Sequence, residues 1–132
     1  MPSHFDWVRD FCLSLPHTTE DIQWGNDLLF RVVRKIYCVM PLEPEVAVKL
    51  SFKCTPEKFA ELVEIEGIIP APYMARNHWV ALVDLNALRP DEIRELISNS
   101  YRLVFAGLPR KLQAELAAKR APRKSARTRR KA

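Results

Sequence analysis

Short apolar segments with very short connections fill the chain between Ile22 and Phe52 and strongly limit its possible folds. The segments are rich in β-branched and aromatic residues, which is typical of strands. They are Ile22–Trp24, Leu28–Val33, Ile36–Met40 and Val46–Phe52, and His78–Val83 is a similar segment further along. Connections such as Arg34–Lys35 are too short for a crossover, so neighbouring strands must run antiparallel. The sequence therefore predicts an antiparallel sheet of about five strands.

Amphipathic helices are predicted before, between and after these segments. A first helix ends before Pro16, a second begins at the cap Thr55 and stops at Gly67, and the longest begins at Pro90. Each is apolar on one side only, which favours packing on one face of the sheet and leaves the other face open. The expected fold class is α+β, with an antiparallel sheet and helices packed on one face.

Positive charge is concentrated at the C-terminal end. The chain has 132 residues and a formal net charge of +5, with 21 basic and 16 acidic residues. The segment 119–132 holds eight of the basic residues and no acid: Lys119, Arg120, Arg123, Lys124, Arg127, Arg129, Arg130 and Lys131. Removing these eight from the 21 leaves 13 basic residues against 16 acidic ones, so the body has a net charge of −3. We expect one domain over residues 1–118 and a disordered basic tail over 119–132, because the tail has too few apolar residues to bury.

Several classes of protein are disfavoured by what the sequence lacks. Its three cysteines show no paired spacing, which argues against a disulfide framework or a zinc site. Charged residues interrupt the N-terminal segment, and no apolar run is long enough to span a membrane, so we expect a cytoplasmic protein without membrane contact. Phosphate-binding glycine loops, nucleophile elbows and zinc-protease motifs are also missing. The expectation is a non-enzymatic protein with no catalytic residues, metal or cofactor.

Basic and aromatic residues are predicted on the open face of the sheet. In Val46–Phe52, strand alternation sends the valines toward the core and Lys49 away from it. Arg31, Lys35 and Trp79 fall on the same exposed side by the same reasoning, and Lys53 follows in register. Cations that meet phosphates beside a ring that stacks on bases would bind nucleic acid. The alternative is an ordinary solvated strand face beside a partly buried tryptophan.

A series of short motifs resembles a known family when taken in order. The motifs are Trp24-Gly25, Arg34-Lys35-Ile36, Val48-Lys49-Leu50, Pro70-Ala71-Pro72-Tyr73, His78-Trp79-Val80 and Ser100-Tyr101-Arg102-Leu103-Val104. In this order and spacing they resemble the MmcQ/YjbR family over about Phe5 to Leu112.

The resemblance implies a CyaY-like fold and a DNA-binding role, because the family's sheet is similar to a double-wing DNA-binding module. Carried over to this sequence, it would place Lys35, Lys49, Arg76 and Trp79 on the binding face. The tail would add non-specific affinity for phosphates. The acidic body departs from this picture, since a duplex-binding fold usually carries its basic footprint itself.

A second function remains open, in which the protein binds a small ligand or another protein. Its pocket would lie between the proline-rich loop and the sheet, with Trp24, Tyr73 and Trp79 as an apolar floor and Lys49 as a polar anchor.

Isolated reactive residues give weaker signals. Cys54 precedes the second helix, whose N-terminal dipole would lower the pKa of its thiol, although free cysteines are more often packing residues. His78 is better explained as a structural histidine, and Ser100 as a helix residue bonded back to the carbonyl of Leu96. A CyaY-like fold also raises iron binding by acidic residues, namely Asp6, Asp10, Glu20 and Asp21. An ordinary solvated face explains these acids better, because a basic residue and a proline interrupt them.

Overall fold

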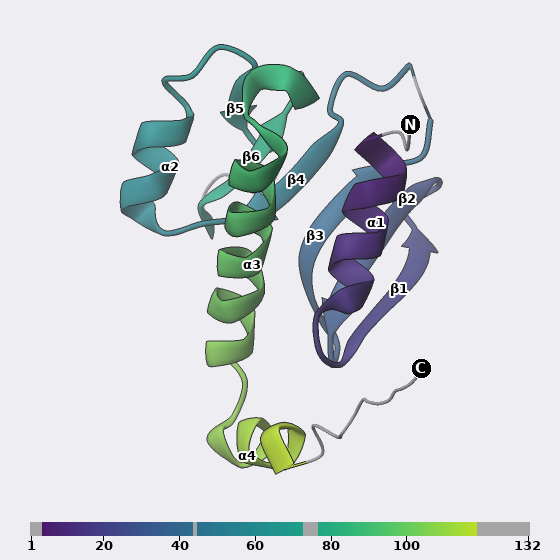
Figure 1. Cartoon of the computed structure of the whole chain (residues 1–132), viewed down its shortest axis with the longest axis vertical. Helices are drawn as coiled ribbons and strands as arrows, with labels where there is room; N and C mark the ends of the chain where they lie inside the picture. Colours follow the sequence, from purple (N-terminus) through teal and green to yellow (C-terminus); the bar gives the residue numbers. More distant parts are fainter. Residues whose placement is uncertain (1–3, 44, 73–76, 119–132) are drawn as a thin grey trace.

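The computed structural model describes residues 4–43, 45–72 and 77–118. The chain begins with a helix and four strands, continues with a second helix and two strands, and ends in further helices (Figure 1). In chain order they are α1 (His4–Ser14), β1 (Thr18–Gln23), β2 (Asp27–Val32), β3 (Lys35–Pro41), β4 (Leu50–Lys53), α2 (Pro56–Leu62), β5 (Ile68–Pro70), β6 (Trp79–Leu82), the 3-10 helix η2 (Leu85–Ala87), α3 (Pro90–Ala106) and α4 (Arg110–Ala118).

The strands form one antiparallel sheet in the order β1-β2-β3-β4-β6-β5. The predicted α+β class is confirmed, with six strands rather than about five. The additional strand is β5, which pairs Ile68 with Leu82 of β6. It is only three residues long and ends at Pro70. A segment this short beside prolines resembles a loop in sequence, and only its partner β6 makes it a strand.

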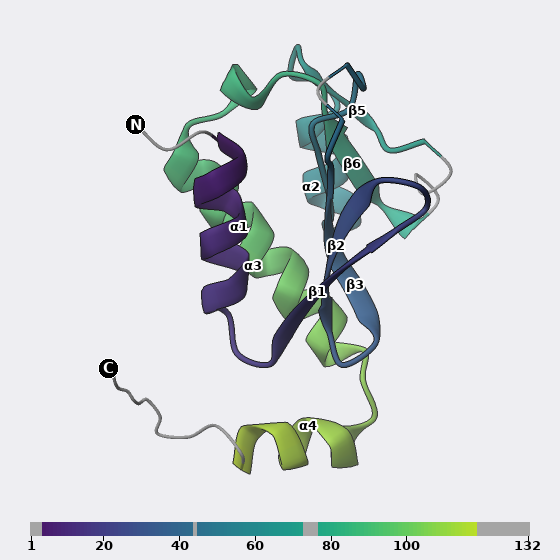
Figure 2. The same ribbon diagram turned by 90° about the vertical axis from the view of Figure 1, so that its right-hand side faces the viewer.

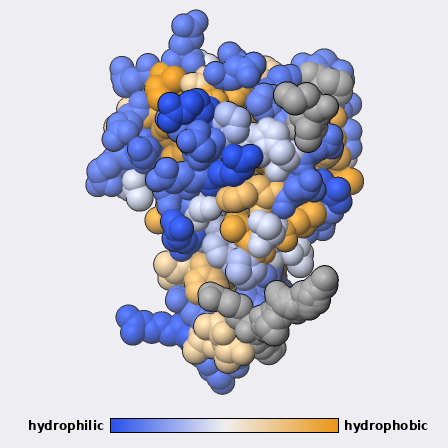
Figure 3. Space-filling model, viewed as in Figure 1, coloured by the Kyte–Doolittle hydropathy of each residue, from blue (hydrophilic) through white to orange (hydrophobic). Residues whose placement is uncertain are grey.

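The helices lie on one face of the sheet, as predicted. Figure 2 shows α1 and α3 together on the same side of the strands. The core between the layers is built on fully buried side chains, including Phe30, Tyr37, Phe52, Ile93 and Ile97. Figure 3, which views the helical side, shows a mostly hydrophilic surface with apolar residues near its middle. Burial of this apolar area is the main force that holds the two layers together.

A β-bulge lets α3 attach to the sheet through a serine. Phe30 pairs with Cys38 and Arg31 pairs with Ile36, so Tyr37 is the extra residue on β3. The buried Ser100 hydroxyl donates to the Tyr37 carbonyl (2.6 Å) and accepts from the backbone N–H of Lys53 on β4 (3.0 Å). Ser100 thus bonds across to two strands rather than back to its own helix.

The segment predicted as the strand Val46–Phe52 is extended only near its end, in β4. Leu50 and Phe52 face the helices as expected, but Val48 packs on the opposite face of the sheet. The alternation expected for Val46 to Lys49 is therefore wrong. The chain bends at Ala47, before β4 begins, and the Lys49 ammonium donates to the Val46 carbonyl (2.7 Å).

The second helix begins as predicted and ends earlier. Thr55 is its N-cap, with the hydroxyl accepting from the Lys58 N–H (3.1 Å). The helix ends at Leu62, well before Gly67. Gly67 has a φ of +95°, and its carbonyl accepts from the Val83 N–H (2.8 Å) at the start of the β5–β6 pair. It therefore forms a turn rather than a helix stop.

The last described helix, α4, lies across the lower end of the molecule, beyond the end of α3 (Figures 1 and 2). The expected tail, residues 119–132, is outside the described residues. None of the described helices is both long and apolar enough to cross a membrane.

Candidate nucleic-acid interface and sheet-face pocket

The face of the sheet away from the helices has an apolar centre. Leu29, Val39, Ala71, Trp79 and Ala81 form a second buried cluster there. Trp79 is only 5% exposed. The prediction that its ring is available to stack on bases is therefore wrong, because neighbouring strands and loops bury that ring.

Two of the predicted basic residues on this face are engaged locally. The Arg31 guanidinium donates through Nε to Asp21 (3.0 Å) and through another nitrogen to the Arg34 carbonyl (2.9 Å). The Lys49 ammonium donates to the Val46 carbonyl, across the bend at Ala47. Because each of the two side chains is bonded to groups beside it, Arg31 and Lys49 do not form one shared basic surface.

Lys35 and Lys53 do come together, at the end of the sheet where β3 begins and β4 ends. With Ile36, Asn77, Trp79 and the end of α3 (Leu103, Val104, Gly107) they line a hollow of about 380 Å³, here called the basic hollow. The Lys53 ammonium donates to the Asn77 carbonyl (3.2 Å). No acidic side chain is among these lining residues. Of the predicted nucleic-acid site, Lys35 and Trp79 thus line the same hollow, together with Lys53.

A strained turn adjoins the basic hollow. Val33 and the exposed Arg34 connect β2 to β3, and Val33 has a φ of +61°. A β-branched residue in this region is an outlier that neighbouring structure must enforce. The turn holds Arg34 at the tip of the hairpin, directly before Lys35.

The remaining predicted nucleic-acid residues cannot be placed. Arg76 lies outside the described residues, as do the tail residues Lys119, Arg120, Arg123, Lys124, Arg127, Arg129, Arg130 and Lys131. Their participation stays a prediction.

A separate pocket opens on the apolar centre of the same face. Its volume is about 560 Å³, and we call it the sheet-face pocket. The lining residues are Trp24, Asp27, Val39, Pro41, Val46, Val48, Ser51, Ala71 and Pro72. Trp24 lines this pocket, as the sequence predicted for the alternative ligand site. Lys49 does not line it, Trp79 is buried within the cluster beneath it, and Tyr73 lies outside the described residues.

Asp27 and Ser51 are polar members of the sheet-face pocket that sequence reasoning missed. Partial burial raises the pKa of the Asp27 carboxyl, and the nearby charge of Glu43 raises it further. Ser51 is 7% exposed. The sequence did hold a signal for Asp27. It directly follows the turn Trp24-Gly25-Asn26, and a hairpin turn brings the residues at its two ends close together.

The structure gives Cys54 no activated thiol. Burial raises its pKa to about 11, although Lys53 and Lys58 oppose the shift. The Sγ atom donates to the carbonyl of His78 (3.3 Å), and the His78 ring packs against Phe59. The expected dipole effect is therefore outweighed by desolvation.

The four acidic residues considered for iron do not form one group. Arg9 of α1 holds Glu20 by a two-pronged ion pair, whereas Asp21 pairs with Arg31 on the other face of the sheet. In the described part of the chain, no three acidic, histidine or cysteine side chains are grouped to hold a metal.

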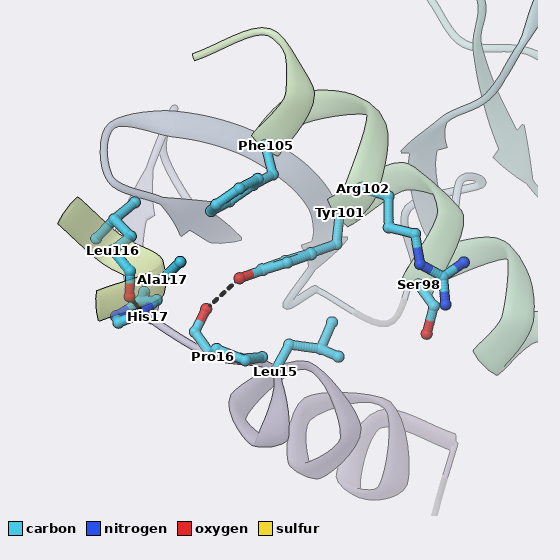
Figure 4. Close-up of a pocket in the computed structure, with 9 residues that line it drawn as sticks. All are labelled: Leu15, Pro16, His17, Ser98, Tyr101, Arg102, Phe105, Leu116 and Ala117. Carbon is cyan, nitrogen blue, oxygen red and sulfur yellow. Dashed lines mark hydrogen bonds between the residues drawn. The ribbon is translucent and has the colours of Figure 1, made fainter. Parts of the chain in front are cut away.

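A further hollow of about 380 Å³ lies between α3, α4 and the loop after α1 (Figure 4). Tyr101 donates to the Pro16 carbonyl, and the ring of Phe105 stacks near Tyr101. The His17 Nε2 atom donates to the Leu116 carbonyl (2.9 Å). These contacts attach α4 to the body, so we interpret this hollow as a packing feature.

Comparison with known proteins identifies relatives of the whole body. The family model described as YjbR matches residues 13–103. A crystal structure of a Deinococcus radiodurans protein with a DUF419 domain is similar, with a TM-score of 0.75 and 27% identity over 86% of this chain and 87% of that one. A Pseudomonas syringae protein has a similar fold, with a TM-score of 0.63 and 24% identity over 78% of this chain and 99% of that one. A search of curated proteins gave no match.

Proposed function

This chain belongs to the YjbR family, and on that premise we propose that it is a non-enzymatic nucleic-acid-binding protein. In this proposal the basic hollow contacts phosphate groups and the basic segment 119–132 adds further phosphate contacts. The protein acts in the cytoplasm, where its three cysteines stay reduced. The DNA-binding role implied by the family resemblance supports the proposal.

One observation supports it most directly. Lys35 and Lys53 line a single hollow that includes no acid, in a body whose net charge is negative. Positive charge gathered in a concave surface attracts phosphate even when the rest of the molecule repels it. Arg34, at the tip of the adjoining strained turn, adds a third cation beside the hollow.

Binding of this kind is independent of base sequence. The burial of Trp79 removes the stacking that would read or hold a base. Contacts from lysines and arginines to phosphates position a protein on the nucleic acid without reading its sequence. Each phosphate that is neutralised lowers the slope of log K against log salt by about 0.9 on duplex DNA.

The test compares binding of labelled duplex and single-stranded DNA at two salt concentrations. The proteins are the full chain, a chain ending at Ala118, and each of these with Lys35→Ala/Lys53→Ala. The matched control is Lys49→Ala/Lys58→Ala, which removes the same charge away from the basic hollow.

We expect the chain ending at Ala118 to bind weakly and the Lys35/Lys53 variant of it to lose that binding. The control pair should change little. Truncation should make the salt slope of the full chain shallower by several units. The body's role is refuted if the chain ending at Ala118 does not bind at low salt, or if both lysine pairs weaken binding equally.

A further inference from the structure

The sheet-face pocket has the size and composition of a small-molecule site and shares no lining residue with the basic hollow. Its volume of about 560 Å³ falls within the usual range for ligand pockets. Valine, proline and alanine side chains form most of its wall, while Asp27 and Ser51 supply polar groups. An apolar wall with few polar groups selects ligands that have an apolar body and one polar end.

Among the described residues, the buried Ser51 hydroxyl has no hydrogen-bond partner. It is 7% exposed, and within the described part of the chain its side chain makes no hydrogen bond. Buried hydroxyls nearly always have a partner, so an unsatisfied one in a pocket wall calls for an explanation. A ligand that bonds to it provides one.

Negative charge lies at the same pocket. The Asp27 carboxylate lines it, and Glu43 is close enough for its charge to act on Asp27. No basic side chain is among the lining residues. Two neighbouring carboxylates repel each other, and a positively charged ligand group would relieve that repulsion.

Trp24 lies at this pocket in a costly backbone conformation. Its φ is +54°, and the residue is 58% exposed. A large aromatic residue rarely adopts a left-handed conformation when glycine would fit, and strain of this kind concentrates at functional sites. An exposed indole beside a carboxylate can hold a cation over its face.

We propose that the sheet-face pocket binds a small apolar amine. The protonated nitrogen is held by the Asp27 carboxylate beside the Trp24 ring, and the apolar body lies against Val39, Val46 and Val48. The Ser51 hydroxyl bonds to a polar atom of the ligand or to the nitrogen itself. This proposal is independent of nucleic-acid binding, because the two sites use different residues.

The test uses three probes of one shape and different charge: phenethylamine, 2-phenylethanol and phenylacetate. Each is titrated into the ¹⁵N-labelled full chain, and amide shifts are followed by NMR. We expect phenethylamine to shift the signals of Val39, Val48 and Ser51. It should bind about tenfold more tightly than phenylacetate, because a charged hydrogen bond to Asp27 is available only to the amine.

Variants separate the charge from the shape of the pocket. Asp27→Asn should bring the affinities for phenethylamine and 2-phenylethanol within about twofold of each other. Glu64→Gln removes the same charge from an exposed position after α2 and should leave the preference unchanged. Trp24→Gly suits the φ of that position, so it should fold and bind phenethylamine more weakly.

Three outcomes would overturn the proposal. One is the absence of shifts at the pocket signals with every probe up to about 10 mM, beyond the weak affinity expected of so small a ligand. Another is equal affinity for phenethylamine and phenylacetate. The third is shifts confined to Lys35 and Lys53, which would assign the binding to the basic hollow instead.

Discussion

Backbone strain is concentrated in single residues at the turns of the sheet. Within the described part of the chain, positive φ angles outside glycine occur at His17, Trp24, Val33 and His78. Each lies at the end of a strand or beside one. The two hairpin residues, Trp24 and Val33, adjoin the sheet-face pocket and the basic hollow respectively.

Relief of this strain can be measured at Trp24. We expect Trp24→Gly to leave the free energy of unfolding unchanged or raise it by up to about 1 kcal/mol, because glycine accepts the left-handed conformation. Gly25 gives the opposite control. Its φ is +87° and an added Cβ would meet nothing within 4 Å, so Gly25→Ala should cost about 1 kcal/mol through conformation alone. Urea denaturation checks both, and a large loss of stability in Trp24→Gly would contradict this account.

Ser100 links α3 to two strands of the sheet through its hydroxyl. Ser100→Ala leaves the Tyr37 carbonyl and the Lys53 N–H without their buried partner. We expect it to lower the free energy of unfolding by about 2 kcal/mol, after the small gain in helix propensity. Ser98→Ala, on the same helix, should change stability by less than about 0.5 kcal/mol. Equal effects of the two substitutions in chemical denaturation would refute the bridging role.

The Arg9–Glu20 pair ties α1 to β1 and makes stability depend on pH. The hydrogen bond from Arg9 lowers the pKa of the Glu20 carboxyl below its ordinary value of 4.5, against partial desolvation. A lowered folded-state pKa gives stability that is present above 4.5 and is lost as pH falls through the folded value. We expect Glu20→Gln to be less stable than the native chain at pH 7, with the difference shrinking below about pH 4.5. Melting temperatures at pH 7 and pH 3 measure this, and a constant difference would contradict it.

At the scale of elements, α4 depends on contacts from outside itself. A helix of nine residues is marginal alone, and none of its residues is fully buried. His17 caps its C-terminal end by donating to the Leu116 carbonyl, one of the groups that a helix leaves unpaired. A residue that is distant in sequence thus helps to hold α4, together with the Gln113 side chain, which donates to the Ala106 and Leu108 carbonyls.

Loss of that cap should loosen α4 selectively. We expect His17→Asn to speed hydrogen exchange of the α4 amides several-fold, with α3 unchanged, because asparagine accepts the φ of +62° but does not reach Leu116. His4→Asn, which changes a histidine on α1, is the control. If α3 and α4 both exchange faster, the substitution has destabilised the body and the capping role is not supported.

At the scale of the whole molecule, charge is divided between the body and the C-terminal segment. A chain ending at Ala118 changes from net positive to net negative, since the eight basic residues beyond it are removed. We expect its melting temperature to match that of the full chain, because residues 119–132 have too little apolar surface to contribute to a core. Its retention should move from cation to anion exchange at pH 7. A clear fall in melting temperature would show that the segment packs on the body.

The sequence alone determined the fold class, because periodicity and connection length are local properties. Short connections required antiparallel neighbours such as β2 and β3. The helices, each apolar on one side only, had to pack that side against one face of the sheet. The sequence also predicted Thr55 correctly as the N-cap of α2. The strand β5 was not, since three residues beside a proline become a strand only through pairing with β6.

The tertiary structure decided the sites. Alternation placed Lys49 and Trp79 on one exposed face, but the Lys49 ammonium bonds to the Val46 carbonyl and surrounding residues bury Trp79. Lys35 and Lys53 meet because β3 begins and β4 ends at the same end of the sheet, beside the end of α3. Asp27 and Ser51 line one pocket because β2 and β4 both pair with β3 in fixed register. Burial and proximity depend on residues distant in the sequence. Local pattern therefore shows which elements form, while packing decides which side chains remain free to bind.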